Sequence, residues 1–295
     1  VDLIVAKVDR LSSAAGEAPQ FFACLGNSAQ FDVLQMVIGQ TADQMHTLLD
    51  EALRAGLIFR SENAYRFLHD RVQEAAYSLL PAERRPETHL RIGTLLAEHT
   101  PLDMLDERGF AIVNQLNRGA QLIATPSERL RVARLNLAAG RRAKAATAYA
   151  SALTYLRAGA AVLEPSNWDS DYTLVFAIEF LMAECELLTA GLSAAEARLS
   201  VLAQRAATRH DFAVVARLRL TLYTALDRGG RCVDVFLGYL RSRGTDWPPH
   251  PDRGEVMHEY ERIWTLVGQR RIEDLVDLPP MADPGVLDML DVCTE

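Results

Sequence analysis

Apolar side chains recur with a helical period from Pro81 to the end of the chain, and no segment there alternates as a β-strand does. The clearest apolar faces consist of Leu130, Ala133 and Leu137; Leu174, Ile178, Leu181, Cys185 and Leu188; Val215, Leu218, Leu222 and Ala225; and Val256, Tyr260, Ile263 and Val267. Short breakers, such as residues 164–167 and 228–230, separate these helices. Helices joined by short connections pack as antiparallel neighbours, so residues 81–295 are predicted to form an array of helical hairpins.

This array has the tetratricopeptide (TPR) pattern only in diluted form. Leu187, Gly191 and Ala195 lie near the small-residue positions of one such repeat. No segment matches the whole consensus, which has about 34 residues. We therefore describe the predicted array as TPR-like.

The part of the chain before the array begins with three short helices. The first ends at Gly26-Asn27, which is a signal for a helix C-terminus, and the second covers residues 31–38. Thr41 and Gln44 have the spacing of a capping box, which predicts the start of the third helix.

A small hairpin follows the third helix. Apolar residues alternate in residues 57–60 and 65–67, on either side of a polar turn. Three helices and a two-stranded wing make a winged helix. The predicted fold class is therefore mainly α, with a winged-helix domain at residues 14–80 followed by a TPR-like antiparallel helical array at residues 81–295.

The cysteines argue against a metal site or a disulfide framework. They lie far apart, with no Cys-x-x-Cys pair and no histidine at metal-ligand spacing. We interpret them as small core residues in a reducing compartment; they are Cys24, Cys185, Cys232 and Cys293. No metal-binding residue is predicted.

A membrane span is not expected. The most apolar stretch, residues 172–183, contains Glu179 and is shorter than the roughly 20 residues that a span needs. The N-terminus does not resemble a signal peptide. A cytoplasmic location without membrane contact is therefore predicted.

Catalytic and nucleotide-binding motifs are absent from the sequence. It contains no phosphate-binding loop, dinucleotide fingerprint, nucleophile elbow or kinase motif. His258-Glu259 begins like a zinc-protease motif, but Arg262 stands where the second histidine would be. A helical array without a pocket motif is typical of a binding scaffold, so no catalytic residue and no cofactor of the chain's own is predicted.

Charge is distributed unevenly along the chain. Residues 101–163 carry 9 basic and 4 acidic side chains, whereas residues 164–295 carry 13 and 22. The basic stretch at residues 118–144 would suit nucleic acid or an acidic partner. We favour a solvated face that pairs with the acidic helices of the same chain, because no aromatic residues are interleaved for stacking.

The third helix, residues 41–55, would be the DNA-recognition helix of a winged-helix domain. It carries Asp43, Asp50 and Glu51 against Arg54 alone. Duplex binding draws most of its affinity from cations that neutralise phosphates. We therefore expect this domain to pack within the protein, with no specific nucleic acid as a partner.

Four segments of the chain resemble one family. They are residues 65–79 (YRFLHDRVQEAAYSL), 23–27 (ACLGN), 112–119 (IVNQLNRG) and 139–145 (AGRRAKA). On these segments the chain resembles the region that follows the ATPase domain in very large bacterial signalling proteins. Those proteins combine a serine/threonine kinase-like domain, a predicted AAA/STAND-type ATPase, a helical region, a GAF domain and a histidine kinase or other output domain.

This resemblance implies that most of the parent protein lies outside the chain. Residues 1–13 would be the tail of the ATPase lid, and the phosphate-binding loop with its ATP or ADP and Mg²⁺ would precede Val1. The kinase domains would lie on both sides. The chain lacks an initiator methionine and stops at Glu295 within an expected helix, so we expect it to be a fragment truncated within the helical array.

The resemblance also singles out His69 and Asp70. STAND ATPases, including NB-ARC proteins, have a Met-His-Asp motif after the winged helix, and its histidine contacts bound ADP. Leu68-His69-Asp70 occupies the same place, with leucine in place of methionine. His69 and Asp70 would then bind ADP as a sensor in the full-length protein, where a helix N-terminus suits a phosphate. The alternative is that His69 only caps the helix and Asp70 only interacts with its dipole.

We therefore expect a non-catalytic regulatory and protein-interaction region of a signalling ATPase and kinase. The winged helix would couple the nucleotide state of the adjacent ATPase domain to the array, and the array would bind a protein partner. The alternative is the central region of a STAND-type, ATP-dependent transcriptional regulator with a DNA-binding domain outside the fragment. A helix-turn-helix beyond Glu295 would favour the alternative, whereas GAF and kinase domains would favour the first interpretation.

Overall fold

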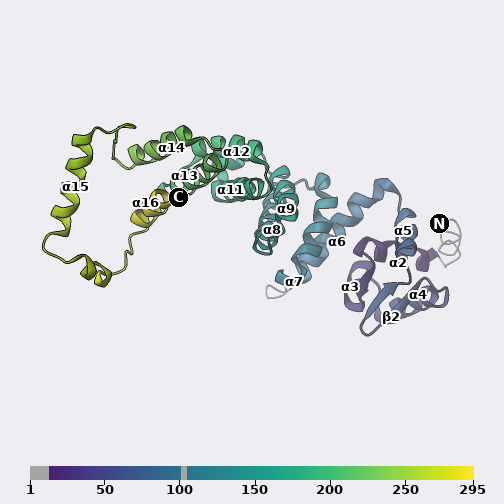
Figure 1. Ribbon diagram of the computed structural model, residues 1–295. Coiled ribbons are helices and arrows are strands. Elements are labelled where there is room, and N and C mark those ends of the chain that lie inside the picture. The colour runs from purple at the N-terminus through teal and green to yellow at the C-terminus, as the bar shows by residue number, and fades with distance from the viewer. Residues whose placement is uncertain (1–12, 101–104) are drawn as a thin grey trace. The chain divides into compact units, whose positions relative to one another are not determined.

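The computed structural model describes residues 13–100 and 105–295 (Figure 1). The chain divides into two compact units. The first unit comprises residues 1–139 with 158–164, and the second comprises residues 140–157 with 165–295. The predicted lid tail lies outside the described residues except for Ser13. The predicted winged-helix limits, residues 14–80, remain a prediction.

The first unit combines helices with three short strands. Its elements are α2 (Ser13–Leu25), β1 (Ser28–Gln30), α3 (Phe31–Ile38), α4 (Ala42–Arg54), β2 (Ile58–Ser61), β3 (Ala64–Phe67), α5 (Asp70–Ser78), η1 (Ala82–Arg84), α6 (Arg85–His99), α7 (Leu105–Arg118), η3 (Ala120–Leu122), the first part of α8 (Pro126–Ala145) and the end of α9 (Tyr149–Ala161). The strands form one antiparallel sheet in the order β1-β3-β2. The β2–β3 hairpin agrees with the prediction, whereas β1 was not predicted because it has 3 residues and buries only Ala29.

The capping box at the start of α4 is confirmed. The Gln44 N–H donates to Thr41 Oγ1 at 3.4 Å, and the Thr41 N–H donates to Gln44 Oε1 at 3.1 Å. The apolar face that follows lies in a core shared with α2, α3, α5 and all three strands. The largest fully buried members of this core are Phe22, Leu34, Met45 and Leu57. Phe22 stacks on Phe67 of β3 with ring centroids 4.3 Å apart, which anchors α2 on the sheet.

A second core connects α2 and α3 to the helices that follow. It contains Cys24, Val37, Leu80, Ile92, Leu96, Ile112, Leu116, Ile123 and Val132. These residues come from α2, α3, α6, α7 and α8, with connecting segments. Since α2 and α3 contribute to both cores, the sheet and helices α6 and α7 are parts of one packed body.

Gly93 allows α6 and α7 to approach closely. A Cβ atom at Gly93 would lie 2.8 Å from Cγ and Cδ2 of Leu116 and 2.9 Å from its backbone nitrogen. Real Cβ atoms do not approach that closely, so only glycine fits without movement of α7. Leu116 is fully buried and cannot move away into solvent.

The second unit is an array of helices. It contains the end of α8, most of α9 (Tyr149–Ala161), α10 (Asn167–Ser170), α11 (Tyr172–Leu188), α12 (Leu192–Arg205), α13 (Arg209–Ala225), α14 (Gly229–Ser242), α15 (Arg253–Val267), η4 (Ile272–Asp277) and α16 (Pro284–Thr294). Consecutive helices from α11 to α14 pack on one another, and α16 packs on α13. The mainly helical character predicted for residues 81–295 agrees with the structure, whose described residues after Pro81 contain no strand. The TPR-like arrangement and its limits remain a prediction.

Helix α11, which holds the most apolar stretch of the sequence, is a core helix of this unit. Phe176, Ala183 and their neighbours pack on α12 and α13. Nowhere in the described ranges does a helix have both the length and the apolar content needed to cross a bilayer.

Two predictions about burial are wrong. Helix α15 forms, but its apolar residues Val256, Tyr260 and Ile263 stay 52%, 52% and 57% exposed, because no other helix covers them in the described structure. Cys24 and Cys185 are core residues as predicted, whereas Cys232 is half-buried and Cys293 is exposed on α16.

We expect Gly93→Ala to destabilise the first unit. The added methyl group must displace Leu116, and such overpacking costs about 1–3 kcal/mol. Gly109→Ala in α7 is the matched control, since a Cβ there meets no atom within 4 Å. The control should stabilise by about 0.5–1 kcal/mol through helix propensity. Urea denaturation followed by circular dichroism measures both, and equal stability of the two variants would contradict the packing argument.

Candidate functional site

Three of the four segments that carry the family resemblance meet at the C-terminal end of α2. The last carbonyl groups of a helix have no partner within the helix. Here the Gln73 side chain of α5 donates from Nε2 to the Ala23 carbonyl at 2.8 Å. The Gln115 side chain of α7 donates from Nε2 to the Cys24 carbonyl at 2.7 Å. One helix end is thus bound by side chains from two other helices.

His69 and Asp70 lie where β3 passes into α5. His69 is the N-cap residue, and its carbonyl accepts a hydrogen bond from the Val72 N–H at 2.8 Å. Its imidazole makes no capping hydrogen bond, and the residue is exposed. His69 thus occupies the cap position of the alternative interpretation, but it caps through its backbone carbonyl and not through its imidazole. Asp70 is the first residue of α5, where a carboxylate interacts favourably with the helix dipole.

The turn after α2 holds Asp70 in place. Gly26 there has φ of 119°, a left-handed conformation that favours glycine. Asn27 Nδ2 donates to Asp70 Oδ1 at 2.9 Å, and the Asn27 carbonyl accepts from the Phe67 N–H at 3.0 Å. The Asn27 Oδ1 atom is buried without a hydrogen-bond partner in the described structure. The structure therefore places Asp70 in a bond within the chain and leaves the adjacent His69 exposed to solvent.

A series of buried hydrogen bonds extends from the C-terminal end of α2 through His89 to Tyr77. Because Gln115 donates from Nε2 to Cys24, its Oε1 accepts from His89 Nδ1 at 2.6 Å. His89 Nε2 then accepts from the Tyr77 hydroxyl at 3.0 Å. This network fixes the neutral Nδ1–H tautomer and connects α5, α6, α7 and α2.

The surroundings of His89 oppose its protonation. Burial lowers the pKa of His89 below its ordinary value of 6.5, and the nearby Arg118 and Arg85 act in the same direction. The hydrogen bond with Gln115 acts in the opposite direction without cancelling the effect. Burial also raises the pKa of the Cys24 thiol to about 11, against the effect of the same arginines, so the thiol stays protonated and unreactive.

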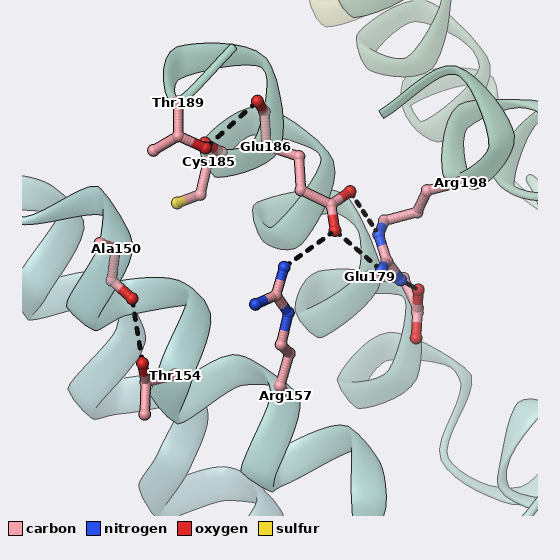
Figure 2. Close-up of polar contacts among 8 residues, drawn as sticks. All are labelled: Ala150, Thr154, Arg157, Glu179, Cys185, Glu186, Thr189 and Arg198. Carbon is pink, nitrogen blue, oxygen red and sulfur yellow. Dashed lines mark hydrogen bonds and ion pairs between the residues drawn. The ribbon is translucent and has the colours of Figure 1, made fainter. Parts of the chain in front are cut away.

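The second unit has its own buried polar centre at Glu186 of α11. Figure 2 shows the Glu186 carboxylate between Arg198 of α12 and Arg157 of α9. Arg198 donates from Nε and Nη2 to the two carboxylate oxygens at 3.0 and 3.1 Å, a bidentate arrangement. Arg157 lies 3.8 Å away, and Glu179 of α11 also binds Arg198. The Glu186 side chain is only 4% exposed, so the two guanidinium groups compensate a buried charge.

The two carboxylates around Arg198 outweigh the effect of burial and keep its guanidinium charged. Burial by itself would lower the pKa of the guanidinium. The hydrogen bonds and charges of Glu186 and Glu179 outweigh that effect and raise the pKa. The arrangement joins α9, α11 and α12 electrostatically and contains no reactive group.

Arg129 and Lys144 of the basic stretch pair with acidic side chains of the same chain. Arg129 binds Glu164 and donates from Nε to the Ile123 carbonyl at 3.1 Å. Lys144 contacts Glu184 of α11 at 2.6 Å. These pairs fit the interpretation of this stretch as a face that pairs within its own chain.

The incomplete zinc motif forms no metal centre. His258 and Glu259 are both exposed on α15, and Glu259 pairs with Arg262 at 3.2 Å. Among the described residues, no group of three histidine, cysteine, aspartate or glutamate side chains could hold a metal ion.

Sequence reasoning missed His89. The signal that could have found it is its position on the buried stripe of α6, since His89, Ile92 and Leu96 recur at helical spacing. A polar side chain on an apolar stripe needs a hydrogen-bond partner. The partner, Gln115, lies within the segment of residues 112–119.

Comparison with known proteins gives one distant relative. No protein family model matches the chain, and no solved structure matches it. The chain is 22% identical over 306 residues to hybrid signal transduction histidine kinase G of Dictyostelium discoideum. The match covers 83% of this chain and 9% of that protein, so the chain spans only a small part of its relative. This similarity supports a role in a multidomain signalling protein.

We expect His89 to make the stability of the chain depend on pH. Its pKa is lower in the folded state than the value of 6.5 expected after unfolding. The unfolded chain therefore binds more protons, and folded stability falls as the pH decreases through and below about 6.5. In His89→Gln this part of the pH dependence should disappear. Thermal melts between pH 8 and pH 5 measure it, with His99→Gln on the same helix as the exposed control; an unchanged pH slope in His89→Gln would contradict the assignment.

We expect Glu186→Gln to destabilise the second unit by roughly 3 kcal/mol. Removing one partner of a buried ion pair leaves uncompensated charge, and the loss is at the lower end of the usual range because Arg198 keeps Glu179. Glu196→Gln is the control, since Glu196 forms an exposed pair with Arg228 that is worth less than about 1 kcal/mol. Chemical denaturation separates the two, and similar losses would mean that burial of Glu186 has no energetic role.

Proposed function

We propose that this chain is a non-catalytic regulatory region of a large signalling protein. It couples the nucleotide state of an adjacent ATPase domain, or the binding of a protein partner, to a downstream output domain. The observation that carries the proposal is the similarity of 83% of the chain to a segment of a signal transduction histidine kinase. ATP or ADP with Mg²⁺ binds the adjacent ATPase domain in this proposal.

The N-terminal part of the first unit acts as a winged helix in this proposal. Helices α2, α3 and α4 share one core with the β2–β3 hairpin, which would be the wing. Asp43 and Asp50 are exposed on α4, and such a surface repels phosphates. This argues for docking against protein rather than against duplex DNA.

The contacts around α2 offer a physical route for coupling. A nucleotide phosphate at His69 would act on the turn that holds Asp70, and Asp70 is bonded to Asn27 at the end of α2. The same helix end holds α7 through Gln115. Coupling through such a path requires two discrete arrangements of these bonds, whose balance the ligand shifts.

We expect His69→Ala in the intact signalling protein to weaken ADP binding about 10-fold and to raise basal output. A hydrogen bond to a charged group is worth roughly 1.5–3 kcal/mol, and each 1.4 kcal/mol is a factor of ten. The melting temperature of the chain should stay unchanged, because the His69 ring makes no capping bond. An ADP titration and a thermal melt are the measurements.

The matched control is His99→Ala, an exposed histidine whose Nδ1 donates to the Leu95 carbonyl of its own helix at 2.9 Å. It should change neither ADP affinity nor output. Unchanged ADP affinity in His69→Ala would contradict the role of His69 as an ADP sensor. The role of the chain as a scaffold for a protein partner would then remain, without a response to nucleotide through His69.

A further inference from the structure

Helix α15 is amphipathic but unpartnered in the described structure. None of its residues is buried. Besides the stripe of Val256, Tyr260 and Ile263, it exposes Trp264 at 46% and Leu266 at 71%. An exposed apolar patch of this kind marks an interaction site.

Part of this patch lines a groove. A cavity of about 870 Å³ lies between α14, the loop at residues 246–251 and α15. Its apolar walls include Val233, Phe236, Trp247, Val256, Tyr260 and Ile263. Three prolines, Pro248, Pro249 and Pro251, stiffen the loop that contributes to its lining. Aromatic and aliphatic walls on two sides, with rigid backbone between them, suit an inserted helix.

The charged groups that line the groove have one sign. Asp246, Glu255 and Glu259 line it together with His258, and no lysine or arginine does. The Glu255 carboxylate also accepts from the Asp252 N–H at 2.8 Å. Asp246 pairs with Arg241 and Glu259 with Arg262, but both pairs are exposed and contribute little. Residues 164–295 as a whole carry 22 acidic and 13 basic side chains. The apolar groove therefore lies in an acidic surface.

We propose that this groove binds an amphipathic helix of a partner protein, with apolar residues at i, i+3 or i+4 and i+7 and with lysine or arginine on its flanks. The apolar residues of the partner helix would fill the groove, and its lysine or arginine side chains would pair with the three carboxylates of the groove. These contacts would give both affinity and orientation. A second copy of this chain docked groove to groove fits less well, because the carboxylates of the two groove linings would face each other. The inference gives the protein partner of the proposed function a site and a chemistry, and so it rests on that proposal.

The test uses the whole chain and two synthetic peptides of about 18 residues, or five helical turns. One has a leucine stripe with lysine flanks, and the other has the same stripe with glutamate flanks. Fluorescence anisotropy measures binding of each labelled peptide. We expect saturable binding of the lysine peptide and at least about 10-fold weaker binding of the glutamate peptide, since like charges repel across the groove rim.

Matched variants on α15 locate the binding site. Ile263→Ser, in the groove wall, should weaken binding of the lysine peptide about 10-fold, the usual effect of truncating a central apolar contact. Leu266→Ser makes the same chemical change on the same helix outside the groove lining and should bind as the unaltered chain does. Glu259→Lys should weaken binding, whereas Glu261→Lys, which does not line the groove, should not.

Several outcomes would overturn the proposal. They are equal binding of the two peptides, equal effects of Ile263→Ser and Leu266→Ser, or a dimer in sedimentation that Ile263→Ser dissociates, which would identify a second copy as the occupant. Absence of any saturable binding would also overturn it. The peptide-binding measurements contain no nucleotide. A negative result would therefore contradict the groove proposal alone, and the ADP titration of the His69 variant would still test the proposed function independently.

Discussion

Two glutamine side chains on the last carbonyl groups of α2 organise the first unit. A helix end buried without partners would leave carbonyl groups unsatisfied in a low-dielectric interior. Gln73 from α5 and Gln115 from α7 satisfy the Ala23 and Cys24 carbonyls, so the position of α2 determines those of two further helices. Phe22 on the same helix stacks on the sheet, and His89 extends the bonded network to α6.

In the second unit, a buried ion pair fixes the register of helices that pack through apolar faces. Its helices pack through apolar faces, which specify burial but not a unique register. The Glu186 carboxylate, bound by Arg198 and contacted by Arg157, adds a directional constraint between α9, α11 and α12. A misplaced helix would leave that buried charge uncompensated, so a shift in register is penalised.

Each of the two units combines a hydrogen-bonded interior with exposed side chains next to it. In the first unit, Asp70 accepts a hydrogen bond from Asn27, whereas the adjacent His69 is exposed. In the second unit, α15 exposes an apolar stripe that lines a groove with three acidic side chains in its lining. The proposed regulatory role depends on such exposed groups, because a ligand can shift an equilibrium only where it makes contacts that differ between two states.

The sequence by itself determined the features that depend on neighbours along the chain. The Thr41 capping box, the β2–β3 hairpin and the helical periods after Pro81 were predictable because caps, turns and helix faces involve residues a few positions apart. Only the tertiary structure decided the β1 pairing with β3, the bonds of Gln115 and His89, and the exposure of α15 and Cys293. Each of these depends on which distant segment covers a surface or satisfies a polar atom, and no local pattern contains that information.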